Sequence, residues 1–354
     1  MDLSKLRKQI DKLDEELLEL LNQRLKIAQQ VGKVKKLRKE DVYAPNREKE
    51  VLSNLLKKNK GPLPASELKD IFREIIKTSL LLQKKLAIAY MGPEASFTHL
   101  AAIKNFGRQA QFISAKNIGD VFNEVEKERA DYGVVPIENT TEGMVNYTLD
   151  MFMDSDLKIC AEVLLEVHHN LASRTTIDKI EKIYSHVQTV AQCRNYLEEK
   201  MSQARIIEVE SNSKAAQLAS QDPKSAAIVS TVAAEMYNLN ILVSRIEDLA
   251  NNYTRFLVVG KNYTAKSGED KTSILFSIKD RIGALYDMLL PFRKAGINLT
   301  KIESRPTKKK AWEYVFFVDF IGHREDEGIR KALAELEKEC LFLKVLGSYP
   351  IGEE

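Results

Sequence analysis

The chain has 354 residues, of which 44% are hydrophobic, and this length predicts two or three globular domains. Its three cysteines, Cys160, Cys193 and Cys340, are far apart and form no C-x-x-C pair, which argues against a disulfide framework or a metal site. There is neither a charged start followed by an apolar segment nor a run of 18 apolar residues, so we expect a cytoplasmic protein without a membrane span.

The net charge of +3 conceals an asymmetry along the chain. Residues 1–86 contain 21 Lys and Arg against 13 Asp and Glu, whereas the remainder contains 33 against 38. A basic helical segment of this kind suits nucleic acid, a membrane surface or a small polyanion. No G-x-G-x-x-G or Walker pattern occurs, so the sequence indicates no nucleotide cofactor.

The first forty residues carry an apolar seam with alternating spacings of three and four, which predicts a helix that packs along its length. No proline or glycine interrupts the seam before Gly32, so we expect one helix of about 35 residues, roughly 50 Å long. Such a helix is longer than a small domain, so its apolar seam needs a partner. A second copy of the chain is the expected partner. The seam consists of Leu3, Leu6, Ile10, Leu13, Leu17, Leu20, Arg24, Ile27, Val31 and Val34.

Arg24 is the only charged residue on this seam, and a buried guanidinium without an anion is costly. Lys35, eleven residues later, lies on almost the same helical face. Arg7 is rotated by roughly 100° and reaches the same point only from a second protomer. The pattern predicts an anion site, with a plain dimerisation arm as the alternative.

Two shorter helices are predicted after the first. The second starts at Pro45, and its pattern places Arg47 and Glu48 on the inward side. In the third, the apolar stripe is continued by two polar residues, Ser79 and Gln83. So many inward polar groups favour a binding site over accidental core polarity.

Residues from about 87 to 262 alternate short apolar strands with helices, which is typical of an α/β fold. A strand at 86–91 leads into a turn and a helix, where the Ser96 hydroxyl suits either a carboxylate ligand or simple capping. The pair His168-His169 has no third metal ligand nearby, so it predicts packing at a strand end.

Two polar stretches in this region adjoin buried strands. An apolar strand ending at Val135 is expected to stop at Pro136, inside VVPIENTTEG (134–143). The second stretch, NYTRF (252–256), precedes the apolar run of a later strand. Because open α/β sheets bind ligands at strand ends, a cation, a hydroxyl and an acid–amide pair there suit a small anionic substrate that gains or loses a proton.

Residues 270–354 predict elements in the order βαββαβ, a ferredoxin-like arrangement that alone indicates no function. The glycine of GALY (283–286) lets a ligand approach backbone N–H groups at a strand–helix turn, and a dimerisation sheet without a ligand is the alternative. Strands are expected at 271–280, 297–306, 311–322 and 341–351.

The segments GPEASFTHLAA (92–102), VVPIENTTEG and NYTRF, in this order and spacing, closely resemble prephenate dehydratase. The flanks, with GALY and ESRP (303–306), resemble the other parts of the bifunctional chorismate mutase–prephenate dehydratase family, and the resemblance covers essentially the whole chain. It implies conversion of chorismate to prephenate and then to phenylpyruvate, without a cofactor. It also implies a multidomain fold: an all-α three-helix mutase domain at 1–86, a two-lobed α/β dehydratase domain of the periplasmic-binding-protein type at 87–262 with an inserted lobe at about 164–248, and an α+β ferredoxin-like ACT domain at 270–354.

The resemblance implies a mutase pocket formed by Arg24, Lys35, Arg47, Glu48, Ser79 and Gln83, with Arg7 of the partner subunit. Arg24 and the partner subunit's Arg7 are expected to hold the substrate carboxylates, Lys35 and Gln83 to contact the ether oxygen, and Arg47 and Glu48 to complete the pocket. A Claisen rearrangement needs no nucleophile, only a pocket for the compact conformer and donors where charge develops. Ala44 stands where this class often has an acidic residue, so hydroxyl recognition is expected to rest on Glu48.

In the dehydratase part, the resemblance implies cleft residues Ser96, Asn139, Thr140, Ser185, His186, Gln188, Gln192, Ser211, Asn212, Arg255 and Phe256. Turn or capping chemistry is the alternative for several of them. Thr254 corresponds to the catalytic hydroxyl of the family. Because threonine is a poor acid, we interpret it as donating a hydrogen bond to the leaving hydroxyl, or as relaying a proton from Glu138.

The resemblance implies feedback inhibition by L-phenylalanine at paired ACT domains, which shift between two states. A homodimer or a dimer of dimers is therefore expected. The effector would contact Gly283, Ala284, Leu285, Glu303, Ser304, Arg305 and Pro306.

Three other functions make different demands on the sequence. A mutase fused to a prephenate dehydrogenase needs a dinucleotide fingerprint, which is absent. A ligand sensor whose cleft binds without reacting has no need of Thr254 or of the intact mutase set. Nucleic-acid binding predicts basic residues exposed on one face, whereas several here are expected to point inward.

Overall fold

The computed structural model describes residues 2–278, 281–306 and 314–353. Residues 279–280 and 311–313 of the expected C-terminal strands therefore lie outside the described residues. The chain forms two compact units, residues 1–86 with 106–111 and residues 87–105 with 112–354.

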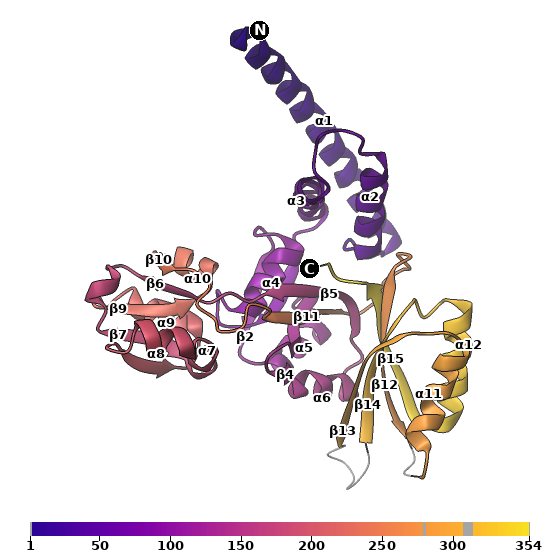
Figure 1. Cartoon of the computed structure of the whole chain (residues 1–354). Coiled ribbons are helices and arrows are strands. Elements are labelled where there is room, and N and C mark those ends of the chain that lie inside the picture. The colour runs from indigo at the N-terminus through magenta and orange to yellow at the C-terminus, as the bar shows by residue number, and fades with distance from the viewer. Residues whose placement is uncertain (1, 279–280, 307–313, 354) are drawn as a thin grey trace. The chain divides into compact units, whose positions relative to one another are not determined.

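The first unit has the predicted three-helix fold (Figure 1). Its helices are α1 (Leu3–Arg38), α2 (Pro45–Lys58) and α3 (Ala65–Gln83). α1 is a single helix of 36 residues, and the Asp2 side chain caps it by accepting from the Ser4 N–H. α3 packs against the C-terminal half of α1, where the lack of a side chain at Gly32 lets Gln83 come close.

The second unit begins with the first lobe, which contains a mixed sheet and the helices beside it. Its strands are β1 (Ala87–Met91), β2 (Gln111–Ala115), β3 (Tyr132–Asn139), β4 (Gly143–Met144), β5 (Lys158–Glu166) and β11 (Tyr253–Gly260), and its helices are α4 (Phe97–Phe106), α5 (Ile118–Glu126) and α6 (Asn146–Asp154). The order is β2-β1-β3-β11-β5, with β4 beside β3. β11 arrives from far along the chain and lies antiparallel to β3 and β5, which places Thr254 opposite Asn139 and Arg255 opposite Glu138.

The second lobe is inserted between β5 and β11, so the chain crosses between the lobes twice (Figure 1). Its elements are β6 (Asn170–Ser173), η1 (Ile177–Lys179), β7 (Lys182–His186), α7 (Val187–Gln192), α8 (Arg194–Lys200), β8 (Arg205–Val209), α9 (Asn212–Ala219), β9 (Ser225–Val229), α10 (Thr231–Met236) and β10 (Asn240–Val243). The sheet order is β10-β6-β9-β7-β8. Alanines dominate the core between one face of this sheet and the helices α9 and α10, which lets these layers pack closely.

The C-terminal module has the predicted βαββαβ order, and the three-part fold class is confirmed. Its elements are β12 (Asp270–Ile278), α11 (Ala284–Lys294), β13 (Leu299–Pro306), β14 (Tyr314–Ile321), α12 (Glu327–Glu339) and β15 (Cys340–Pro350). The sheet order is β13-β14-β12-β15. Side chains alternate across this sheet: Ile274 and Phe276 pack with the two helices, whereas Leu275 packs with Ile159 and Leu257 of the first lobe.

The expectation that Pro136 ends its strand is wrong. β3 continues to Asn139, because the register with β11 shifts beside Ile137 and the missing proline N–H falls next to this irregularity. The Pro136 carbonyl accepts from the Thr148 hydroxyl at 2.6 Å. Glu138 and Asn139 are therefore part of the sheet, and the polar turn begins after them at Thr140.

Gly347 of β15 lies where the C-terminal sheet meets β5, and a Cβ there would collide with the carbonyl oxygen of Ile159. We expect Gly347→Ala to lower the free energy of unfolding by about 1–3 kcal/mol through overpacking, as measured by urea denaturation. Gly328→Ala on α12 is the control, because a Cβ at that position meets open space and should be neutral or stabilising. Equal losses in both variants would contradict the close approach.

Candidate active sites

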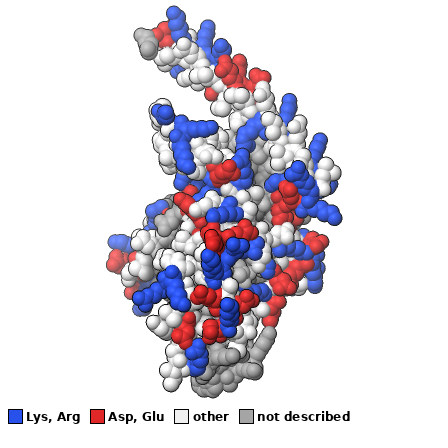
Figure 2. All heavy atoms as spheres, turned by 90° about the vertical axis from the view of Figure 1, so that its right-hand side faces the viewer, with Lys and Arg blue, Asp and Glu red and all other residues white. Residues whose placement is uncertain are grey.

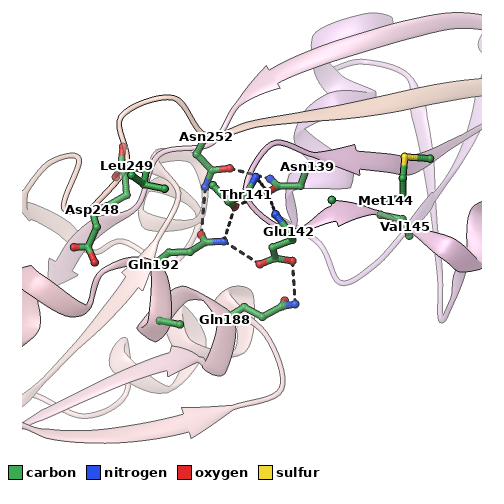
Figure 3. Close-up of a pocket in the computed structure, with 13 residues that line it drawn as sticks. Asn139, Thr141, Glu142, Met144, Val145, Gln188, Gln192, Asp248, Leu249 and Asn252 are labelled. Carbon is green, nitrogen blue, oxygen red and sulfur yellow. Dashed lines mark hydrogen bonds between the residues drawn. The ribbon is translucent and has the colours of Figure 1, made fainter. Parts of the chain in front are cut away.

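A cavity of about 450 Å³ lies between the two lobes of the second unit. The first lobe contributes the turn after β1, the start of α4 and the ends of β3 and β11, and the second lobe contributes α7 and the start of α9. A wider hollow of about 780 Å³ adjoins it, shown in Figure 3. The two share Asn139, Glu142, Val145, Gln188, Gln192 and Asn252.

Successive residues of β11 point to opposite sides of the sheet. Thr254 and Phe256 line the cavity, whereas Arg255 between them does not. Their partners on β3 follow the same rule, since Asn139 lines the cavity and Glu138 does not. The strand pair therefore presents a hydroxyl and an amide on one face, and a cation and an acid on the other.

The orientation of Asn139 follows from groups that have only one hydrogen-bonding role. Its Oδ1 accepts from the backbone N–H groups of Thr141 and Glu142, at 2.9 and 3.0 Å. Its Nδ2 therefore faces Thr254 Oγ1 and Asn252 Oδ1, both at 2.8 Å. Because the Thr254 oxygen accepts this bond, its own proton is left for the cavity.

The chain of hydrogen bonds continues across the cavity to α7 (Figure 3). Asn252 Nδ2 donates to Gln192 Oε1 at 3.3 Å, and Gln192 Nε2 donates to the Glu142 carboxylate at 2.9 Å. Glu142 also accepts from Gln188 Nε2 at 3.0 Å. One carboxylate of the first lobe thus holds two amide donors of the second.

Most residues that were expected in the cleft line the cavity. Besides Asn139, Gln192, Thr254 and Phe256, these are Ser96, His186, Gln188, Ser211 and Asn212. The hydroxyls of Ser96 and Ser211 also cap helices, because they accept from the N–H groups of His99 and Lys214. These two serines therefore each cap a helix and also line the cavity.

Thr140 and Ser185 line neither hollow, and the structure does not support their expected contact with substrate. Thr140 Oγ1 donates to the Asn251 carbonyl at 2.9 Å and accepts from the Tyr253 N–H at 3.0 Å, which ties the β3 end to β11. Ser185 is fully buried, and its hydroxyl donates to the backbone carbonyl of His186.

The structure does not support the expected roles of Arg255 in substrate binding and of Glu138 in a proton relay, because the strand pleat turns both side chains away from the cavity. The Arg255 guanidinium is buried between the first lobe and the C-terminal sheet. It donates to Glu162 at 2.7 Å, to Asp319 at 2.6 Å and to the Tyr349 hydroxyl at 2.9 Å. Glu138 pairs with Lys301 of β13 at 2.5 Å.

Electrostatics keep this buried cluster charged. Burial alone would raise the pKa of Glu162, but the charges of Arg255 and Lys271 outweigh it and lower that pKa. The Lys271 ammonium lies 2.8 Å from the same carboxylate. The cluster is therefore a paired ionic contact between domains.

Two cavity residues that contact Gln192, Glu142 and His169, were not expected as site residues. His169 is buried and lines the cavity, as does Val167 two positions earlier in the chain. The signal is a histidine at the point where an apolar strand leaves one lobe. This sequence signal can be interpreted only when the place where the chain crosses between the lobes is known.

In the first unit, one face of α1 meets α3. Arg24 Nη1 donates to Ser79 Oγ at 2.5 Å, and Gln83 lies against Gly32, two turns further along α1. Burial lowers the pKa of Arg24. Lys35, on the same face of α1, has its pKa lowered by burial too, partly offset by nearby acids. The structure therefore brings Arg24 to Ser79 and places Gln83 along the same interface. The Lys35 ammonium instead donates to the backbone carbonyls of Asp41 and Val42.

Two expected mutase residues do not join this group within the chain. The Arg47 side chain is 63% exposed and pairs with Glu50 at 2.7 Å, so the prediction that it faces inward is wrong for this structure. Arg7 is exposed on the same helix as Arg24, and seventeen residues of helix separate them by roughly 25 Å. Glu48 is half-buried at the start of α2.

The two C-terminal motifs lie at the start of α11 and on β13. Gly283 has φ 75°, a left-handed conformation, with open space where a Cβ would project, next to buried Ala284 and exposed Leu285. On the edge strand β13, Ser304 and Pro306 are exposed, whereas Glu303 and Arg305 are half-buried. Arg305 Nη2 lies 3.2 Å from the carboxylate of Asp150 on α6.

Surface charge and metal-ligand geometry bear on the alternative functions. On the face shown in Figure 2, Lys and Arg lie among Asp and Glu rather than in one basic field. Within the described residues, no His, Cys, Asp and Glu side chains gather in threes as a metal site would need. The helices of the described part include none that is long and apolar enough to cross a bilayer.

Comparison with known proteins gives the same order of parts. Family models match residues 6–84 (chorismate mutase type II), 88–264 (prephenate dehydratase) and 272–338 (ACT domain). A bifunctional chorismate mutase/prephenate dehydratase of Aquifex aeolicus is 51% identical, covering 99% of this chain and 98% of that protein. One from Pseudomonas aeruginosa is 44% identical, covering 98% and 97%. The prephenate dehydratase of Arthrobacter aurescens, solved with L-Phe, aligns with TM-score 0.69 and 32% identity, over 75% of this chain and 90% of that one.

The Arg255 cluster predicts a stability defect rather than a binding defect. Arg255→Met should lower the free energy of unfolding by about 3–5 kcal/mol, because Glu162 and Asp319 would remain buried without their cation. Arg194→Met, which breaks an exposed pair with Glu198, should leave the urea midpoint unchanged. A stable Arg255→Met protein with only a raised KM would instead restore the substrate-binding role.

Proposed function

Because this chain belongs to the family of bifunctional chorismate mutase/prephenate dehydratases, we propose that its helical unit rearranges chorismate to prephenate and its two-lobed cavity converts prephenate to phenylpyruvate, carbon dioxide and water. The observation that carries the second assignment is the orientation of Thr254. Its oxygen accepts from Asn139 at the cavity wall, so its proton remains free to donate to a group in the cavity. A hydroxyl donor is what a departing hydroxyl group requires.

In the dehydratase step, the bond from the ring to its carboxylate breaks, and the electron pair completes the aromatic ring as the bond to the ring hydroxyl breaks. The departing hydroxide takes up a proton that comes from solvent and leaves as water. Thr254 donates a hydrogen bond to this oxygen, and Asn139 holds the threonine in place.

The carboxylates of prephenate need donors, and the amide groups of Gln188 and Gln192 supply them. In the substrate-free protein both donate to Glu142. A substrate carboxylate presents the same acceptor geometry and competes for the same two groups. Glu142 thus holds the lobes together until a substrate anion replaces it.

In the mutase step, the protein needs to gather charge around a compact chorismate conformer. Arg24 binds a carboxylate, while Lys35 and Gln83 donate to the breaking ether oxygen. Arg24 is already held by Ser79, which limits the reorganisation needed on binding.

A homodimer completes the mutase pocket. The seam of α1 is exposed in the single chain, with Leu13 at 62% and Leu17 at 55%, and this apolar surface calls for a second copy. Antiparallel pairing of two long helices brings Arg7 of the partner subunit near Arg24. A cytoplasmic location belongs to the same proposal, because all three cysteines are free, as suits a reducing compartment.

L-phenylalanine acts on paired ACT domains, binding between the start of α11 and the outward residues of β13. The inward residues of that strand reach the first lobe, since Lys301 contacts Glu138 and Arg305 contacts Asp150. These contacts adjoin the segment that carries Asn139. Movement of β13 on effector binding therefore reaches the cavity.

Thr254 variants test the dehydratase assignment. Thr254→Val should reduce kcat for prephenate by roughly 100-fold or more, because the hydrogen-bond donor to the leaving oxygen is lost, whereas Thr254→Ser should keep much of the rate. Phenylpyruvate absorbance in alkali measures the reaction, and mutase activity of the same polypeptide serves as the control for folding. Full activity of Thr254→Val would refute the assignment.

Mixed dimers test the shared mutase pocket. Arg7→Ala and Arg24→Ala chains should each be inactive, but unfolding and refolding them together should restore roughly a quarter of the wild-type rate, because one pocket of each mixed dimer is intact. Mixing Arg24→Ala with Lys35→Ala should restore nothing, since both residues come from the same chain. Recovery in the second mixture, or none in the first, would exclude a pocket built from two chains.

A further inference from the structure

His169 is a cavity residue that the proposed mechanism leaves without a role. It is 2% exposed and lines the same cavity as Thr254. Its Nε2 lies 2.6 Å from Oε1 of Gln192, while its Nδ1 is buried without a hydrogen-bond partner. The neighbouring His168 instead pairs with Glu166 and Glu247, away from the cavity.

The direction of the network fixes the protonation of this imidazole. Gln192 Nε2 donates to the Glu142 carboxylate, which can only accept, so Gln192 Oε1 faces His169. The His169 Nε2 therefore carries a proton and donates it. Burial lowers the pKa of His169, so the ring is neutral and its Nδ1 is bare.

The imidazole ring is held from two further directions. The backbone N–H of His169 donates to Glu247 Oε2 at 2.9 Å. The imidazole ring lies edge-on to the Phe97 ring, with the ring centroids 5.8 Å apart. Glu247 belongs to the second crossing between the lobes, so this bond joins the two crossings. The donor atom is therefore at a fixed place before substrate arrives.

Gln192 needs this donor because an amide can rotate. A rotated amide would present its oxygen to Glu142 or to a substrate carboxylate, which is repulsive. Two donors oppose the rotation, His169 Nε2 at 2.6 Å and Asn252 Nδ2 at 3.3 Å. The shorter bond is the stronger one, so His169 supplies most of the preference.

We propose that His169 is a positioning residue of the dehydratase site, whose Nε2–H fixes the Gln192 amide so that its NH₂ group faces the substrate carboxylate. This inference rests on the proposed dehydratase function. It concerns anion binding and not departure of the hydroxyl, because Asn139 takes its orientation from backbone N–H groups and holds Thr254 independently.

Three variants test this role, with kinetics on prephenate and mutase activity as the control for folding. His169→Leu should raise KM by roughly tenfold, the worth of one hydrogen bond to a group that binds an anion, and leave kcat within about twofold. His169→Gln places an NH₂ group near the position of Nε2 and should restore most of the wild-type KM. Lys224→Met, which breaks an exposed pair with Glu181 in the same lobe, should leave KM unchanged.

Some results would overturn the role. A loss of kcat at unchanged KM in His169→Leu, or equal defects in His169→Leu and His169→Gln, would show that His169 does not act through Gln192. An unchanged KM in His169→Leu would show that Asn252 alone orients the amide. A wild-type protein that consumes no prephenate would refute the proposed function, and the role of His169 with it.

Discussion

The pairing of β3 with β11 is the constraint on which both faces of the first lobe depend. Side chains alternate along a strand, so two consecutive residues, Thr254 and Arg255, serve different parts of the molecule. Thr254 faces the cavity, and Arg255 faces the C-terminal sheet. A one-residue slip would exchange them and place a buried guanidinium in the cavity. The ionic cluster around Arg255 therefore also fixes the register that positions Thr254.

The segment between β10 and β11, where the chain crosses between the lobes for the second time, also contacts two parts of the molecule. Asn252 continues the hydrogen-bond chain from Asn139 to Gln192, while Glu247 accepts from the backbone of His169 on the first crossing. Burial alone would raise the pKa of Glu247, but hydrogen bonds from His168 and the His169 N–H lower it. The hinge is thus held by a charged group, and the cavity residues nearest to it inherit a fixed geometry.

Local patterns were sufficient for the helices, the element order and the three-part fold, because spacing of apolar residues decides them. They also placed Asn139, Gln192 and Thr254 in one cavity, with the help of the family resemblance. Arg255 was expected in the cleft. Side chains alternate along a strand, however, so the residue next to Thr254 faces away from the cleft. Pro136 was misread as a strand end because the irregularity that accommodates it depends on β11, a distant segment. His169 was missed because its surroundings come from both lobes.

The close join between the C-terminal sheet and the first lobe has a consequence for engineering. Lys344 of β15 donates to the carbonyls of Phe152 and Ser155 at the end of α6, and Lys301 neutralises Glu138. Truncation before β12 would strip these cations away and expose the apolar face of β5 and β11 to water. Single substitutions on the exposed residues of β13 would therefore disturb the first lobe less than removal of the whole C-terminal module.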